Sequence, residues 1–173
     1  MTKDFGEPPL AMENKALVEQ RIKEVRDGQG VPETLTIEFR GQPRHVEVID
    51  MPVSQLFYNP GTHRIRAQRS HDPVRDAALD ADPWSDESQD YLHHLLKAQP
   101  SDPSKQDPAF EALLESLRDF KQNEPGLITR SGIIVNGNTR RAALKELGVT
   151  TIRVGVLPAS CTWADIHAVE LSL

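Results

Sequence analysis

The sequence predicts an α/β (α+β) fold in which helices pack on a small mixed sheet, with an acidic insertion. Three observations predict it. Segments with apolar residues at helical spacing alternate with short segments in which apolar and polar residues alternate. The 173 residues suffice for one domain with a core, and 13 prolines with 10 glycines indicate many loops. The charge is uneven: residues 118–153 carry seven Lys or Arg against three Asp or Glu, whereas residues 76–108 carry two against eight.

The N-terminal part is predicted to contain one helix and one hairpin. Leu17, Ile22 and Val25 recur at roughly helical spacing within residues 11–27. The segments "TLTIEF" and "RHVEVI" alternate at period two on either side of "RGQP". This pattern predicts a hairpin over residues 34–49.

The chain is divided here into an N-terminal helical extension, residues 1–33, and one domain, residues 34–173. Within that domain, residues 67–107 are rich in Asp, Ser, Pro and Gln, and we interpret them as an insertion or lid rather than core. Their only periodic stretch predicts a short helix over about residues 86–97.

The pattern is tighter from residue 108 onward. A helix is predicted over "PAFEALLESLRDFKQN", with an apolar face made of Phe110, Leu113, Leu114, Leu117 and Phe120. The segments "GLITR" and "GIIVN" predict two short strands, which are followed by a helix over about residues 139–147 and the strand "TIRVGVLP". A last helix is predicted from Thr162 to the final residue. Because that helix has no C-terminal cap, we expect the chain to be the front part of a longer protein.

The composition excludes several classes of protein. No apolar run approaches the roughly 18 residues of a membrane span, and the N-terminus lacks a signal-peptide core. Cys161 is the single cysteine, so an intrachain disulfide framework is excluded. The net charge of −6 argues against a uniformly basic nucleic-acid-binding surface but is compatible with a local basic site. We expect a cytoplasmic protein without membrane contact.

The functional prediction depends on the motif "GIIVNGNTRRAALKELG", residues 132–148. A strand passes through a glycine turn into a helix whose first turn contains Arg140 and Arg141. Cations at a helix N-terminus are disfavoured by roughly 0.3–1 kcal/mol each, whereas the unpaired N–H groups there bind anions, above all phosphate. An anion held by these amides and guanidinium groups resolves the conflict. The alternative is that both arginines are merely solvated; the motif is neither a Walker A loop nor a dinucleotide fingerprint.

The segments around this motif resemble the N-terminal domain of the ParB/sulfiredoxin superfamily. The stretches "FEALLESLRDFKQN", "EPGLITRSGIIVNGNTRRAALKELG" and "TIRVGVLP" follow the family's order of a helix, a strand pair, a Gly-x-x-Arg turn into a helix, and a strand. Upstream, "VIDMPVSQLFYNPGTHRIR" is similar to the family's opening strand, its Asn-Pro and its downstream arginine. The resemblance covers about residues 46–66 and 108–171, with the 67–107 segment between them.

The resemblance implies a nucleotide site. In ParB-type members a Gly-Glu-Arg-Arg turn and an upstream arginine hold the phosphates of a nucleotide, typically CTP, together with a magnesium ion. The positions that the resemblance implies for phosphate binding are Gly137, Asn138, Thr139, Arg140, Arg141 and either Arg64 or Arg66. Glu170 falls where the family's acidic box begins, which makes it the candidate metal ligand and the candidate catalytic group.

The chain departs from both branches of the superfamily. Asn138 stands where sulfiredoxins carry their reactive cysteine, so reduction of a sulfinic acid is not expected. Asn138 also stands at the position of the glutamate of the ParB turn, and Thr139 at that of its first arginine, so both family residues are missing. The resemblance supports nucleotide binding better than any single reaction.

The expected function is binding of a nucleoside triphosphate, CTP or ATP with magnesium, in a DNA-related process of a bacterium or phage such as partition, regulation or defence. Two alternatives stay open. The first is a nucleotide-hydrolysing or phosphotransfer enzyme, or a nuclease, on the same fold. The second is a DNA- or protein-binding module without nucleotide, whose binding would depend steeply on salt. Because ParB-like proteins commonly work as dimers, a homodimer is a further expectation.

Overall fold

A computed structural model describes residues 3–122 and 124–173 of the chain. The described residues form six α-helices, two 3-10 helices and six strands, which confirms the predicted α/β class. The α-helices are α1 (Ala11–Asp27), α2 (Pro73–Ala81), α3 (Asp86–Lys97), α4 (Pro108–Phe120), α5 (Asn138–Glu146) and α6 (Trp163–Ser172). The 3-10 helices are η1 (Val53–Gln55) and η2 (His63–Ile65). The strands are β1 (Thr34–Phe39), β2 (Gln42–Pro52), β3 (Phe57–Tyr58), β4 (Gly126–Ile128), β5 (Ile133–Asn136) and β6 (Thr151–Val156).

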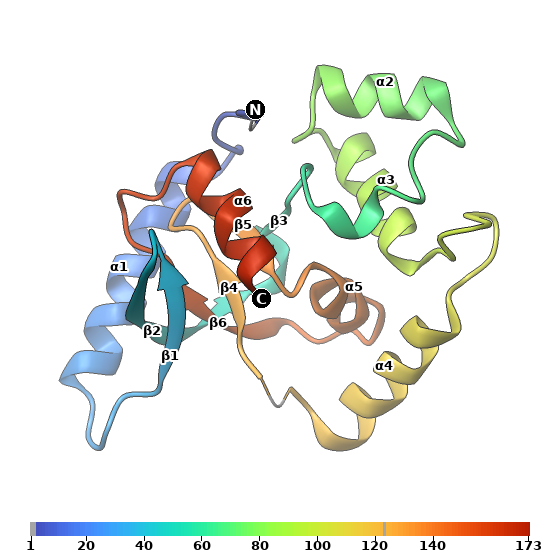
Figure 1. The fold of residues 1–173 in the computed structure, drawn as a ribbon. Coiled ribbons are helices and arrows are strands. Elements are labelled where there is room, and N and C mark those ends of the chain that lie inside the picture. The colour runs from blue at the N-terminus through green and yellow to red at the C-terminus, as the bar shows by residue number, and fades with distance from the viewer. Residues whose placement is uncertain (1–2, 123) are drawn as a thin grey trace.

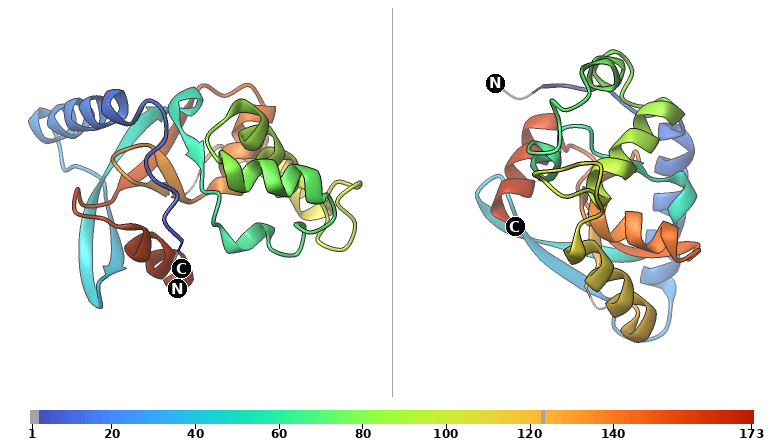
Figure 2. Two further views of the ribbon diagram at one scale, coloured as in Figure 1. Left: turned by 90° about the horizontal axis from the view of Figure 1, so that it is seen from above. Right: turned by 90° about the vertical axis from the view of Figure 1, so that its right-hand side faces the viewer.

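The six strands make one mixed sheet in the order β1-β2-β6-β4-β5-β3. The pairs β1–β2, β2–β6 and β4–β5 are antiparallel, whereas β4–β6 and β3–β5 are parallel. The predicted hairpin is confirmed, and its two-residue turn places Arg40 and Gly41 at φ 53° and 78°. Positive φ at both turn residues matches the right-handed twist of the strands. The hairpin lies at one end of the molecule and the α2–α3 segment at the other (Figure 1 and Figure 2).

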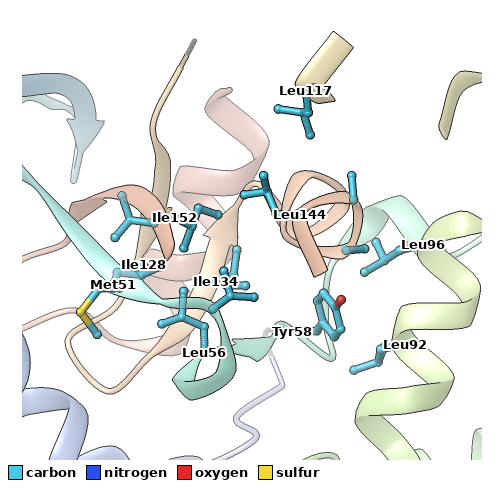
Figure 3. Packing of buried hydrophobic residues seen from close by; sticks show 14 of the residues in the cluster. Met51, Leu56, Tyr58, Leu92, Leu96, Leu117, Ile128, Ile134, Leu144 and Ile152 are labelled. Atoms are coloured by element: carbon cyan, nitrogen blue, oxygen red, sulfur yellow. The ribbon is translucent and has the colours of Figure 1, made fainter. Parts of the chain in front are cut away.

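Helices cover both faces of the sheet, with α1 on one face and α6 on the other (Figure 2). Successive strand residues point to opposite faces, so Leu127 belongs to one apolar cluster and Ile128 to the other. The larger cluster joins the sheet to α1, α3 and α5 (Figure 3). The smaller one joins it to Ile166 and Val169 of α6. Helix α1 shares this core, because its Val18 is completely buried in the larger cluster.

The 67–107 segment contributes to the core. Leu92 and Leu95 of α3 are almost completely buried in the larger cluster, where Leu92 lies near Tyr58 of β3 (Figure 3). The interpretation of this segment as a lid rather than core is therefore wrong for α3. The helix predicted over about residues 86–97 is confirmed, but the polar composition of the segment did not indicate that its apolar side is buried. Full burial of a Leu side chain contributes about 1.5–3 kcal/mol.

A polar network fixes α3 against α5. His93 accepts or donates through both ring nitrogens, with Nδ1 2.5 Å from Tyr58 Oη and Nε2 2.8 Å from a Glu146 carboxylate oxygen. Lys97 Nζ donates to the same oxygen over 2.8 Å. Burial lowers the pKa of His93, and the hydrogen bond from Lys97 is the largest cause that lowers the pKa of Glu146. The network holds the 67–107 segment in a defined place beside α5.

The helix predicted from residue 108 is confirmed as α4. Its predicted apolar face is buried at Phe110 and Leu117 and half-buried at Leu113 and Leu114. The side chain of Phe120 and the whole of residue 123, both within the predicted helix, lie outside the described residues. No helix in the described part of the chain is long and apolar enough to cross a membrane.

Candidate functional site

A cavity of about 510 Å³ lies where β5 ends and α5 begins. The segment around η2, the start of α4 and the end of α6 also line it. Six of the eight residues that the sequence placed in the site line this cavity: Arg64, Gly137, Asn138, Thr139, Arg140 and Glu170. Segments far apart in the chain therefore meet at the predicted turn.

The turn itself requires glycine. Gly137 is the N-cap of α5 and has a φ of 101°, a left-handed conformation that side chains disfavour. A Cβ at this position would also lie 3.3 Å from Cα of Gly126. No side chain caps α5 at this N-cap, so the first N–H groups of the helix are available to an anion at the cavity.

Asn138 ties the turn to the segment that precedes η2. Its side chain is buried, its Oδ1 accepts from the Asn59 N–H over 3.0 Å, and its Nδ2 donates to the Ile134 carbonyl over 3.1 Å. Because both ends of its side-chain amide are engaged, the side chain of Asn138 positions the turn. Its backbone N–H is the group that Asn138 can offer to a ligand. Thr139, which follows it, is half-buried and lines the cavity.

Arg140 lines the cavity and carries a charge that no group of the described chain pairs. Its Nη1 is buried without a hydrogen-bond partner in the described residues and lies 3.6 Å from where a Cβ of Gly137 would be. Burial lowers the pKa of the guanidinium, Glu124 opposes this shift, and Arg153 adds to it. Since an arginine stays protonated even so, a half-buried cation with one buried and unsatisfied nitrogen stands at the helix N-terminus. Such a group favours an anionic ligand.

Arg141 has a different role. It is buried, and its Nη2 donates to the carbonyls of Val53 and Leu56 over 2.9 and 3.1 Å. Its guanidinium also lies 4.5 Å from the ring centre of Tyr58. The structure thus does not bring Arg141 to the cavity; it joins α5 to η1 and β3. Neighbouring residues of a helix point about 100° apart, which is the one signal in the sequence that the two arginines face different surroundings.

The structure distinguishes the two candidate upstream arginines. Arg64 lies in η2 and lines the cavity of the turn. Arg66 lines a neighbouring cavity of about 460 Å³ together with Arg69 and Trp163. The Thr62 hydroxyl accepts from the Arg64 N–H over 3.4 Å, which starts the 3-10 turn and orients this segment. Only Arg64 is therefore placed beside Gly137 and Arg140 in one cavity.

Glu170 reaches the cavity from α6, and its carboxylate binds η2. Its Oε1 accepts from the backbone N–H of His63 over 2.9 Å and lies 2.6 Å from His63 Nδ1. Among residues 3–122 and 124–173, no group of three or more His, Cys, Asp and Glu side chains is arranged to hold a metal ion. Glu170 is thus a single carboxylate, engaged at one oxygen, at the rim of the cavity.

Sequence reasoning missed one wall of the cavity. Gln68, Leu96 and Pro100 of the 67–107 segment line it, as do Phe110 and Leu113 of α4. The apolar spacing of α4 predicted that one face of this helix is buried, but not that part of this face lines a cavity. Nothing local in the sequence marks Gln68, which meets the turn only through the fold.

Neither a family model nor a curated protein sequence matches this chain. Two solved structures do. One is the C-terminally truncated chromosome-partitioning protein ParB from Caulobacter crescentus complexed with CTP-γ-S, at 15% identity and a TM-score of 0.45 over 72% of this chain and 50% of that one. The other is a Pnob8-like ParB-N domain, at 13% identity and a TM-score of 0.36 over 73% of this chain and 31% of that one. The chain thus spans at most half the length of either.

Proposed function

We propose that the chain binds a nucleoside triphosphate, CTP or ATP, with its phosphates in the cavity at the N-terminus of α5. The observation that carries the proposal is Arg140, a residue of the cavity wall whose guanidinium has a buried nitrogen that no described residue satisfies. Gly137 leaves the helix N-terminus accessible beside it, and Arg64 adds a second cation from η2. Two guanidinium groups and a row of backbone N–H groups suit a polyphosphate better than a single carboxylate.

We also propose that magnesium accompanies the nucleotide, with Glu170 as its protein ligand. Magnesium is usually bound through one or two carboxylates plus substrate phosphates and keeps several waters. One half-engaged carboxylate at the rim of a phosphate cavity fits this habit. The ion would neutralise part of the phosphate charge there.

The biological setting belongs to the same proposal. The resemblance to ParB supports a DNA-related process such as partition, regulation or defence, in the cytoplasm and with a second copy of the chain as partner. Direct binding of DNA phosphate at the cavity is the competing interpretation of the same cations. In that case the affinity for DNA would fall steeply with salt concentration, and the protein would show no preference among free nucleotides.

Substitution of the two candidate upstream arginines tests the site. Arg64→Ala is expected to weaken binding of the preferred nucleotide about tenfold or more, because it removes a charge-assisted contact to phosphate. Arg66→Ala is the matched control, since it removes the same charge two residues away in the neighbouring cavity. Calorimetric titration with magnesium present measures both. Equal losses in the two variants would mean that only the general positive charge matters and would contradict the proposed site.

A further inference from the structure

The 67–107 segment forms one wall of the cavity and is held firmly in place. The stretch after α3 folds back on itself, with Gln99 N–H donating to the Lys105 carbonyl over 2.9 Å and Asp107 N–H donating to the Lys97 carbonyl over 2.8 Å. A β-bridge also joins Ala98 to Gln106. These bonds fix the position at which Leu96 and Pro100 line the cavity.

The cavity has two chemically different parts. The polar part has cations and N–H groups from Arg64, Gly137 and Arg140, and its lining also includes the acidic residues Asp107, Glu124 and Glu170. Leu96 and Pro100, with Phe110 and Leu113 of α4, supply apolar surface. A ligand with a polyanionic tail and a flat, largely apolar head matches this division. If the phosphates lie at α5, the head of the ligand lies against the wall that the 67–107 segment provides.

Gln68 is the one polar side chain of that segment with an unsatisfied buried atom. The residue is 6% exposed and lines the cavity, and its Oε1 has no hydrogen-bond partner in the described part of the chain. Its Nε2 donates to the Ala98 carbonyl over 3.3 Å. This bond sets the amide orientation, because the flipped amide would place two oxygens against each other. A residue of the cavity wall therefore carries a buried hydrogen-bond acceptor whose lack of a partner is costly.

We infer that Gln68 is a specificity-determining residue that accepts a hydrogen bond from an exocyclic amino group of the bound base, with the 67–107 segment as the base-facing wall. The inference rests on the proposed nucleotide binding and adds the chemical class of base. A base that carries a carbonyl in place of the amino group would place oxygen against oxygen. A site built around a hydrogen bond rejects the analogue that cannot make it.

Two nucleotide pairs that differ at this group test the inference. CTP and UTP carry an amino and an oxo group at the same ring position, as do ATP and ITP. In whichever pair binds, the wild-type protein is expected to bind the amino member about tenfold more tightly or better. Gln68→Met has a similar volume but lacks the acceptor. It is expected to reduce the preference for the amino member to about twofold or less. Binding of inorganic tripolyphosphate should be unchanged, because the phosphate part of the cavity is intact.

The outcomes separate the inference from the function on which it rests. If tripolyphosphate binds and the two nucleotides of a pair bind with nearly equal affinity, the role of Gln68 is overturned and the phosphate site is left intact. A ratio that persists in Gln68→Met would overturn it as well. Failure of every nucleotide and of tripolyphosphate to bind would overturn both. If Gln68→Met does not fold, equal wild-type affinities for the amino and oxo members still overturn the role of Gln68.

Discussion

Replacing Arg141 with alanine is expected to lower the free energy of unfolding by about 2–4 kcal/mol. The substitution removes the donor that the carbonyls of Val53 and Leu56 share; the Val53 carbonyl keeps its bond from the Leu56 N–H over 3.3 Å, whereas the Leu56 carbonyl loses its side-chain donor. Each buried acceptor left unsatisfied costs about 1–3 kcal/mol, and water entering the space recovers part of that cost. The cation–π contact with Tyr58 is lost as well. Urea denaturation followed by circular dichroism measures the change.

Two further variants show whether the guanidinium geometry is the cause. Arg141→Lys keeps the charge but not the fork that reaches two carbonyls, so an intermediate loss is expected. Both arginines have one buried nitrogen without a partner, but Arg140, unlike Arg141, donates no hydrogen bond to any described residue. Arg140→Ala should therefore change the free energy of unfolding by less than about 0.5 kcal/mol. A loss as large for Arg140→Ala as for Arg141→Ala would show that the two arginines do not differ in the way described here.

Arg140→Ala is expected instead to weaken nucleoside triphosphate binding by about 30-fold to 100-fold. A hydrogen bond to a charged group is worth about 1.5–3 kcal/mol, and in this cavity it would also satisfy a nitrogen that is already buried. The loss should appear in calorimetric titration with CTP and ATP in the presence of magnesium. It should persist at higher salt, because a partly buried contact is screened less than a surface one.

Stability and binding should therefore separate at adjacent residues of one helix. Arg140→Ala is expected to remain folded and lose binding, whereas Arg141→Ala, where it still folds at low temperature, should retain the groups that line the cavity. Nucleotide binding that is unimpaired in Arg140→Ala would contradict the proposed function, which rests on Arg140 as a phosphate contact.

The parts of the fold that the sequence predicted are those with local patterns. Alternation over residues 34–49 predicted the hairpin, and the glycine between a strand and a helix predicted the turn at Gly137. The burial of α3 was missed because a few apolar residues stand among acids, and only contacts with the sheet reveal that they are buried.

The site was predictable in outline and not in its details. The helical pattern indicates that the two adjacent arginines face different surroundings, but only their partners in the structure show which one is structural. Asn138 meets Asn59, which is 79 positions away in the chain, so the sequence shows a candidate ligand contact where the structure shows a tether. The choice between Arg64 and Arg66 depends on how η2 turns, and the contribution of Gln68 depends on the packing of the 67–107 segment.

The most direct test of the phosphate site is the backbone amide spectrum of ¹⁵N-labelled protein during titration with CTP, ATP, GTP and UTP, with magnesium present. The amides of residues 137–140 donate at the helix N-terminus, so they are expected to shift saturably with one or more nucleotides, together with those of residues 62–64. Tripolyphosphate should shift the same amides. Saturable shifts confined to other parts of the chain, or no shifts with any of these ligands, would contradict the claim that this cavity binds a nucleoside triphosphate.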